Sequence, residues 1–205
     1  MPSTNGMWPG LASLILAATV VMGSPGPSTM SATAIGAAFG FRRSLAYLLG
    51  LILGTTAVLL AVAAGVIAML LSLPGLAPVL LIASSAYILY LAYRIATAAP
   101  LSREDRPAKA PSFAGGFLLA VANPKAYLAI AAVFAGARLG FERSVTEAVV
   151  KIAVLTIMIV IIHFVWLMAG VSLSRLLHSP TGSRIVNLLF AAILIATTIM
   201  TLLRG

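Results

Sequence analysis

The chain has 205 residues, of which 61% are hydrophobic and only 8% are charged, and its mean hydropathy is +1.13. Soluble domains average about a quarter charged residues, so this composition excludes a soluble globular protein and indicates an integral membrane protein. The formal net charge is +9, but the cationic residues are dispersed between apolar segments, which argues against a nucleic-acid partner. The chain has no cysteine, which excludes thiol–disulfide electron carriers and thiolate metal sites.

A helix that crosses a bilayer needs about 20 apolar residues. Six segments qualify, at roughly residues 8–35, 44–71, 76–98, 113–137, 149–172 and 183–203, and no strands are evident. The first segment is longer than one straight helix needs to cross the bilayer, which is consistent with a break in the helix. No lysine or arginine precedes its apolar run at 11–23, so we expect a retained helix there rather than a signal peptide. The pattern predicts an all-α polytopic membrane protein with six transmembrane helices.

A polar linker at 99–112, which contains three prolines and five charged residues, divides the chain. It separates one three-helix repeat, residues 1–98, from a second, residues 113–205, within one membrane domain. An odd number of helices per half places the second half upside down relative to the first. The pattern therefore predicts the 3+3 inverted repeat of many secondary transporters.

The positive-inside rule predicts the orientation of these helices. One membrane face would carry the larger basic set, which is expected to be cytoplasmic: Arg42, Arg43, Arg94, Arg103, Arg106, Lys109, Arg175 and Arg184. The opposite face would carry Arg138, Arg143, Lys151 and Arg204. Both termini are then expected outside.

Proline interrupts the first helix at Ser24-Pro25-Gly26-Pro27. A proline lacks the backbone N–H and clashes with the preceding turn, so the break frees backbone groups that lipid cannot satisfy. The half-helix that resumes at Pro27 would present its positive end to a substrate carboxylate, and Ser28 and Thr29 would add hydroxyl groups. The alternative is a bend that neighbouring helices compensate.

Asn123-Pro124-Lys125 repeats this arrangement in the fourth helix, about half the chain further on. Paired interruptions in corresponding halves point to the substrate site of a transporter. A lysine near the bilayer midplane costs about 2.5–3.5 kcal/mol on insertion scales, so Lys125 is a candidate partner for the substrate carboxylate or for a proton. The alternatives are that Lys125 reaches the interface or caps carbonyls freed by Pro124.

Other residues carry less information about chemistry. All four acids, Glu104, Asp105, Glu142 and Glu147, lie in loops or at helix ends, and only two histidines are present, so no catalytic, metal or cofactor site is expected. His163, in the fifth helix, is a proton-coupling candidate; the alternative, which occurs more often, is a neutral histidine bonded to a neighbouring helix. The spacings Gly36…Gly40 and Gly50…Gly54 favour close helix packing within the chain, with a homodimer contact as the alternative.

Several of these motifs, in this order, resemble the LysE/RhtB family of amino-acid exporters. The resemblance covers roughly residues 20–130 and comprises Pro25-Gly26-Pro27, the run 40–43 (GFRR), the run 86–94 (AYILYLAYR), the run 115–118 (GGFL) and the run 123–126 (NPKA). It implies export of small amino acids or related metabolites across the bacterial inner membrane, driven by the proton gradient. It also implies that the two proline motifs flank the translocation site.

The chain departs from the family pattern at Thr55, where members often carry an acidic residue just after the glycine that matches Gly54. The departure implies a different cation site, another substrate or a changed activity. In the leading hypothesis, Lys125 and the half-helix end after Pro27 hold the substrate carboxylate, and Asn123, Ser28, Thr29 and Thr55 supply polar contacts. Two alternatives are a passive small-solute facilitator and a non-transporting membrane scaffold or regulatory subunit.

Overall fold

The structure is a computed structural model, which describes residues 4–65 and 112–173 together with scattered positions between 82 and 97 and between 181 and 199. The elements within this part are helical: α1 (Thr4–Ala17), the π-helix η1 (Ala18–Met22), α2 (Pro27–Ala63), α5 (Phe113–Val121), α6 (Pro124–Gly136) and α7 (Ser144–Leu173). Only scattered positions of the predicted spans at 76–98 and 183–203, and only Ser112 of the linker at 99–112, are among the described residues. The count of six helices and the inverted repeat therefore stay predictions.

The first transmembrane segment is interrupted where its prolines stand. Helix α1 widens into η1, and residues 23–26 that follow are not helical. Helix α2 then begins at Pro27, because the fixed backbone angle of proline and its missing N–H suit the first position of a helix. A π-helical turn before such a break is frequent at functional sites.

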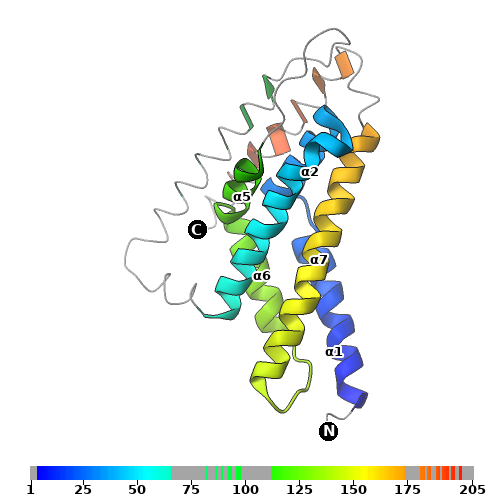
Figure 1. Ribbon diagram of the computed structural model, residues 1–205, viewed down its shortest axis with the longest axis vertical. Coiled ribbons are helices and arrows are strands. Elements are labelled where there is room, and N and C mark those ends of the chain that lie inside the picture. The colour runs from blue at the N-terminus through cyan, green and yellow to red at the C-terminus, as the bar shows by residue number, and fades with distance from the viewer. Residues whose placement is uncertain are drawn as a thin grey trace.

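Helix α2 folds back on itself at Gly40, whose backbone has φ 71° and ψ 176°. Glycine adopts a positive φ without the penalty that a side chain brings. The hydroxyl of Ser44 stabilises the turn by donating to the carbonyls of Gly40, at 2.6 Å, and Ile35, at 3.1 Å. The first run, 27–39, leads away from the end that holds the N-terminus, and the second run, 41–63, returns (Figure 1).

Several helix ends differ from the predicted limits. The first segment continues past 35 to the turn at Gly40, and the second run ends at Ala63 rather than at 71. The residue Gly65, with φ 70°, follows that end. Helix α7 begins at Ser144 rather than at 149, because its first turn is polar and a hydropathy rule detects only the apolar run that follows.

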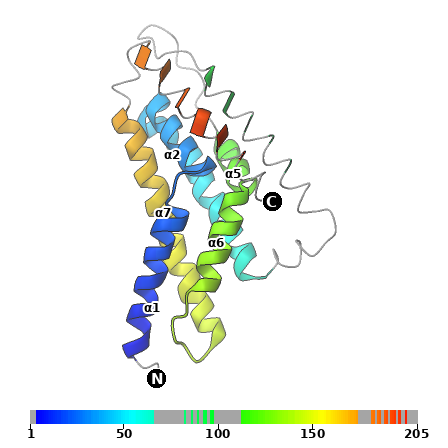
Figure 2. The same cartoon turned by 180° about the vertical axis from the view of Figure 1, so that it is seen from behind.

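The fourth segment is also broken, between α5 and α6, which meet at an angle of 61°. Ala122 closes α5 and Asn123 caps α6, which begins at Pro124. Figure 2 shows α5 followed by α6 toward the end that holds the N-terminus, opposite in direction to α1 and the first run of α2. The two broken segments therefore run antiparallel.

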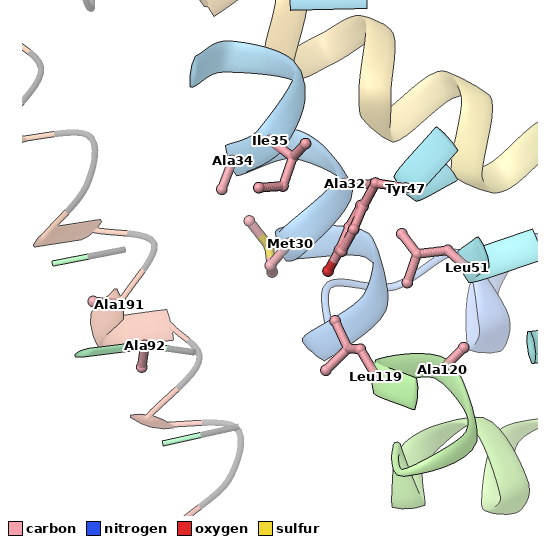
Figure 3. Close-up of a cluster of buried hydrophobic side chains, with 10 residues drawn as sticks. All are labelled: Met30, Ala32, Ala34, Ile35, Tyr47, Leu51, Ala92, Leu119, Ala120 and Ala191. Atoms are coloured by element: carbon pink, nitrogen blue, oxygen red, sulfur yellow. The ribbon is translucent and has the colours of Figure 1, made fainter. Parts of the chain in front are cut away.

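Two hydrophobic clusters lie on opposite sides of the breaks. The first joins residues after the first break with residues before the second, such as Met30, Ile35, Leu119 and Ala120 (Figure 3). The second joins residues before the first break with residues after the second: Leu14, Ala18, Ile130 and Val133, together with Val58, Leu59, Ala137, Leu139, Leu155 and Ile159. Residues on one side of the first break therefore pack with residues on the opposite side of the second break. Both breaks lie at the boundary between the two clusters.

Glycines let the helices of the two halves touch along their backbones. A Cβ atom on Gly170 of α7 would collide with the Thr33 carbonyl in the first run of α2, and one on Gly116 of α5 would collide with the Tyr47 carbonyl in the second run. Gly50 and Gly54 face α5 in the same way, at Phe113 and Phe117. These glycines therefore serve packing within the chain.

Two of the described helices contain a stretch long and apolar enough to cross a membrane: α7, and α2 through the run 41–63 that follows its turn at Gly40. The bent pair of α5 and α6 counts as a third if the two helices form one span. Side chains exposed on these helices are largely apolar, as expected for surfaces that face lipid. The chain is a helical membrane protein.

Candidate functional site

The two helix breaks meet in space, and Lys125 joins them. Its ammonium group donates to the carbonyl oxygen of Ser24 at 2.5 Å, to the hydroxyl of Ser24 at 2.8 Å and to the carbonyl oxygen of Pro25 at 2.8 Å. An ammonium group has three donors, so these acceptors use all of them. The lysine of the second break thus stabilises carbonyls freed by the first.

Gly26 makes room for this lysine. A Cβ atom at position 26 would lie 2.6 Å from the Cδ atom and 2.9 Å from the Nζ atom of Lys125. The backbone of Gly26 is extended, with φ −172° and ψ 178°, so any residue could adopt its conformation. The requirement for glycine at this position comes from the stem of Lys125, which crosses the break directly over it.

Asn123 forms a second bridge between the breaks. Its side-chain oxygen accepts from the backbone N–H of Lys125 at 3.1 Å and caps α6, while its amide nitrogen donates to the Ser28 hydroxyl at 2.9 Å. The Asn123 side chain is buried. Asparagine suits this position because it caps one helix while it donates to the other.

Thr29 caps the half-helix that begins at Pro27. Its hydroxyl accepts from the backbone N–H of Gly26 at 2.9 Å and donates to the Gly26 carbonyl at 3.0 Å. The first turn of a helix leaves N–H groups without partners in the helix and concentrates positive potential there. This end of α2 therefore presents a polar, electropositive surface beside Asn123 and Lys125.

Two aromatic residues that the sequence did not single out as site residues also satisfy the breaks. The indole N–H of Trp166, on α7, donates to the Gly23 carbonyl at 3.0 Å, and the Tyr127 hydroxyl donates to the Val121 carbonyl at the end of α5 at 2.6 Å. The available signal was weak: each is an aromatic residue with a polar tip within one helical turn of His163 or Lys125. In an apolar span, the sequence does not distinguish such a residue from one that only packs against neighbouring helices.

A pocket lies where the breaks meet; we call it the break pocket. The empty space at the pocket is about 420 Å³ when its open mouth and the solvent in that mouth are included. About 40 Å³ of it is open to the centres of water molecules. Its lining comes from η1, the two breaks, both runs of α2, α6 and α7, and consists of Met22, Gly26, Ser28, Thr29, Thr55, Asn123, Lys125, Ala126, Ala129, Ile130, Ile159, Ile162 and His163.

Two polar atoms in the lining of the break pocket have no hydrogen-bond partner among the residues that the structure describes. They are the hydroxyl oxygen of Thr55 and the Nε2 atom of His163, and both residues are about 95% buried. The Nδ1 atom of His163 lies 2.8 Å from the Ile159 carbonyl. Because a carbonyl only accepts, Nδ1 carries the proton, and Nε2 of the neutral ring is an acceptor. A buried polar group without a partner costs about 1–3 kcal/mol, so these two atoms need a water molecule or a solute as a partner.

The structure brings together every residue predicted for the site. Ser28, Thr29, Thr55, Asn123, Lys125 and His163 all line the break pocket, and Pro25, Pro27 and Pro124 stand at the breaks that form it. The pocket offers a cation, a helix N-terminus, hydroxyl groups and an imidazole, which suits binding of a small polar solute. Among the described residues, no group of three or more His, Asp or Glu could hold a metal ion.

Comparison with known proteins gives a match to one family. A family model described as LysE type translocator matches residues 18–205, which include both breaks and the whole lining of the break pocket. No curated protein and no solved structure matches the chain. The resemblance seen in the sequence is thereby confirmed, and members of this family are membrane transporters of small solutes, not enzymes.

Proposed function

The chain belongs to the LysE type translocator family, and from this premise we propose that it is a secondary transporter that exports amino acids or related small metabolites. We propose that it works in the bacterial plasma membrane, that the proton gradient drives it, and that the break pocket holds the substrate. The fold would be completed by the spans predicted at 76–98 and 183–203 as a 3+3 inverted repeat.

One observation carries this proposal: both broken helices contribute to one pocket, and polar side chains bond one break to the other. Lys125 of the second break bonds to Ser24 and Pro25 of the first, and Asn123 bonds to Ser28. Movement of either half would therefore change the pocket. Alternating access requires such a link between a central site and the arrangement of the two halves.

In the proposed complex, Lys125 and the N-terminal end of α2 hold the substrate carboxylate. The ammonium of Lys125 now bonds only to neutral acceptors, and a carboxylate forms a stronger, charge-assisted bond. The substrate would replace one of these acceptors, and thereby loosen the link between the breaks. Asn123, Ser28, Thr29 and Thr55 would supply the remaining polar contacts.

His163 is the residue we propose for proton coupling. The ring of His163 lines the break pocket, and its Nε2 atom has no partner within the described part of the chain. A histidine can gain and lose a proton near neutral pH. The proposed orientation places the Gly40 turn, which is followed by Arg42 and Arg43, in the cytoplasm. The N-terminal helix and the loop with Arg138, which approaches Gly10, would then lie outside.

Export from whole cells tests the proposal. Cells that express the chain are loaded with a mixed dipeptide pool, and the amino acids that appear outside are quantified with and without a protonophore. Lys125→Ala should abolish export, whereas Lys151→Ala should retain it. Lys151 is a matched control because it is also a buried lysine, but it bonds to Phe134 and Glu147 away from the break pocket.

Each outcome of this experiment bears on one part of the proposal. Equal export by the intact chain and Lys125→Ala, at equal membrane abundance, would refute the role of Lys125. Export that ignores the protonophore would favour the passive facilitator. Export by His163→Gln that is fast but no longer sensitive to the protonophore would support coupling through His163.

A further inference from the structure

We propose that the break pocket selects its substrate by charge. It accepts amino acids, or similar solutes, with a net charge of zero or below, and it rejects those with a net positive charge. This inference rests on the proposed function, because it concerns the substrate of the same pocket.

The charges around the break pocket are positive. Lys125 is the one lysine or arginine in its described lining, and that lining includes neither Asp nor Glu. The whole chain has only four acids. Of these, Glu147 forms an ion pair with Lys151 at 2.8 Å outside the pocket, and Glu142 is exposed in the loop before α7.

The remaining segments of the chain cannot supply a carboxylate from within the membrane. The other two acids, Glu104 and Asp105, belong to the polar linker, and the sequence of the predicted spans at 76–98 and 183–203 contains neither Asp nor Glu. The charged residues of those spans are Arg94 and Arg184. Wherever these spans pack, they add no negative charge to the pocket.

The free polar atoms of the pocket are neutral acceptors. Thr55 contributes a hydroxyl oxygen from the second run of α2, and His163 contributes the Nε2 atom from α7. Together they can accept hydrogen bonds from one amine or hydroxyl group of a solute. They offer no countercharge to a second cationic group.

The balance of charge decides which solutes fit. A zwitterion brings a carboxylate for Lys125 and one ammonium group for the neutral acceptors, so its charges are matched in the pocket. A solute with an additional cationic group brings an uncompensated charge close to Lys125 in a site of low dielectric. We expect such a solute to bind about tenfold more weakly, or worse.

Binding to the purified full-length chain in detergent tests this selection apart from transport. The probes are L-alanine, L-glutamate and L-lysine at matched ionic strength, and the measurement is the rise in unfolding temperature as each is titrated. Alanine and glutamate should stabilise the protein. Lysine should need at least about ten times the concentration of alanine for the same rise.

A pair of variants at Thr55 provides the gain-of-function test. Thr55→Asp places a carboxylate in the lining, and Thr55→Asn has nearly the same shape without the charge. Lysine should stabilise Thr55→Asp at concentrations at which it has no effect on Thr55→Asn or on the original chain. If Thr55→Asp does not give a monodisperse protein, the titrations of the original chain decide the question alone.

The outcomes separate charge selection from export. Stabilisation of the original chain by lysine at the same concentrations as alanine would overturn the inference, and so would the absence of stabilisation by any probe. If alanine binds and lysine does not, but proteoliposomes release no alanine, charge selection stands and the proposed export fails. Gain of lysine binding by Thr55→Asn would also count against selection by charge.

Discussion

The indole N–H of Trp166 donates a hydrogen bond to the carbonyl oxygen of Gly23 at 3.0 Å, although the two residues are 143 positions apart. The next two carbonyls along the chain, those of Ser24 and Pro25, accept from Lys125. Three consecutive carbonyls that the first break removes from helical bonding thus receive donors from α6 and α7. Since lipid offers no donors, the geometry of this break depends on these two side chains.

Trp166→Phe should lower stability because phenylalanine keeps an aromatic ring at this position but has no N–H donor for the Gly23 carbonyl. The loss of a hydrogen bond to a part-buried carbonyl costs about 1–2 kcal/mol, seen as a lower unfolding temperature in detergent. Trp8→Phe is the matched control, since Trp8 is 66% exposed. Equal unfolding temperatures for the two variants would contradict the role given to Trp166.

Gly26→Ala should impair export while the protein still folds. The added methyl group would lie 2.6 Å from the Cδ atom and 2.9 Å from the Nζ atom of Lys125, so the side chain must shift and its bonds to the carbonyls of Ser24 and Pro25 are weakened. We expect a loss of at least about tenfold in export rate, on the argument that a small displacement of a positioning group has a large kinetic cost. Gly136→Ala, where a Cβ atom meets nothing within 4 Å, should export normally; a matching loss in both variants would refute the argument.

Substitution by alanine should destabilise the protein at one of two adjacent glycines in α5 and have little effect at the other. A Cβ atom on Gly116 would collide with the backbone of Tyr47, whereas one on Gly115 would have its nearest neighbours at 3.8 Å. Gly116→Ala must push α5 away from α2 and should cost about 1–3 kcal/mol or more. Size-exclusion chromatography of fluorescent fusions should show loss of the monodisperse peak for Gly116→Ala only.

The bond between Ser28 and Asn123 should appear as energetic coupling. Ser28→Ala and Asn123→Ala each remove one partner of a buried hydrogen bond, so the double variant should lose less than the sum of the single losses. A double-mutant cycle on the free energy of unfolding in mixed micelles should give a coupling of about 1 kcal/mol. Additive losses would mean that this contact contributes nothing to the link between the breaks.

The positions of both breaks could be predicted because proline acts locally. Pro27 and Pro124 each begin a helix in the structure, and the hydropathy pattern indicated a membrane protein without any tertiary information. The turn at Gly40 was implied only by the gap between two apolar segments. The apolar pattern of the sequence does not predict that Gly40 has a positive φ.

The partners within the site could not be predicted from local pattern. One interpretation of the sequence is that Lys125 caps carbonyls freed by Pro124, whereas in the structure it bonds to carbonyls of the other break. Thr55 was singled out through the family resemblance, and its place in the pocket depends on how α2 folds back. The sequence does not show that Trp166 is a donor, because only the tertiary fold brings the Gly23 carbonyl to its indole N–H.

The dependence of the first break on Lys125 and Trp166 also constrains the biosynthesis of the chain. When Gly23, Ser24 and Pro25 leave the ribosome, the donors for their carbonyls are still about 100 to 140 residues from being translated. Until then, water, the insertion machinery or lipid headgroups must solvate these carbonyls. The first broken helix is translated before the donors for its carbonyls, so it reaches its final shape only after α6 and α7 have been made.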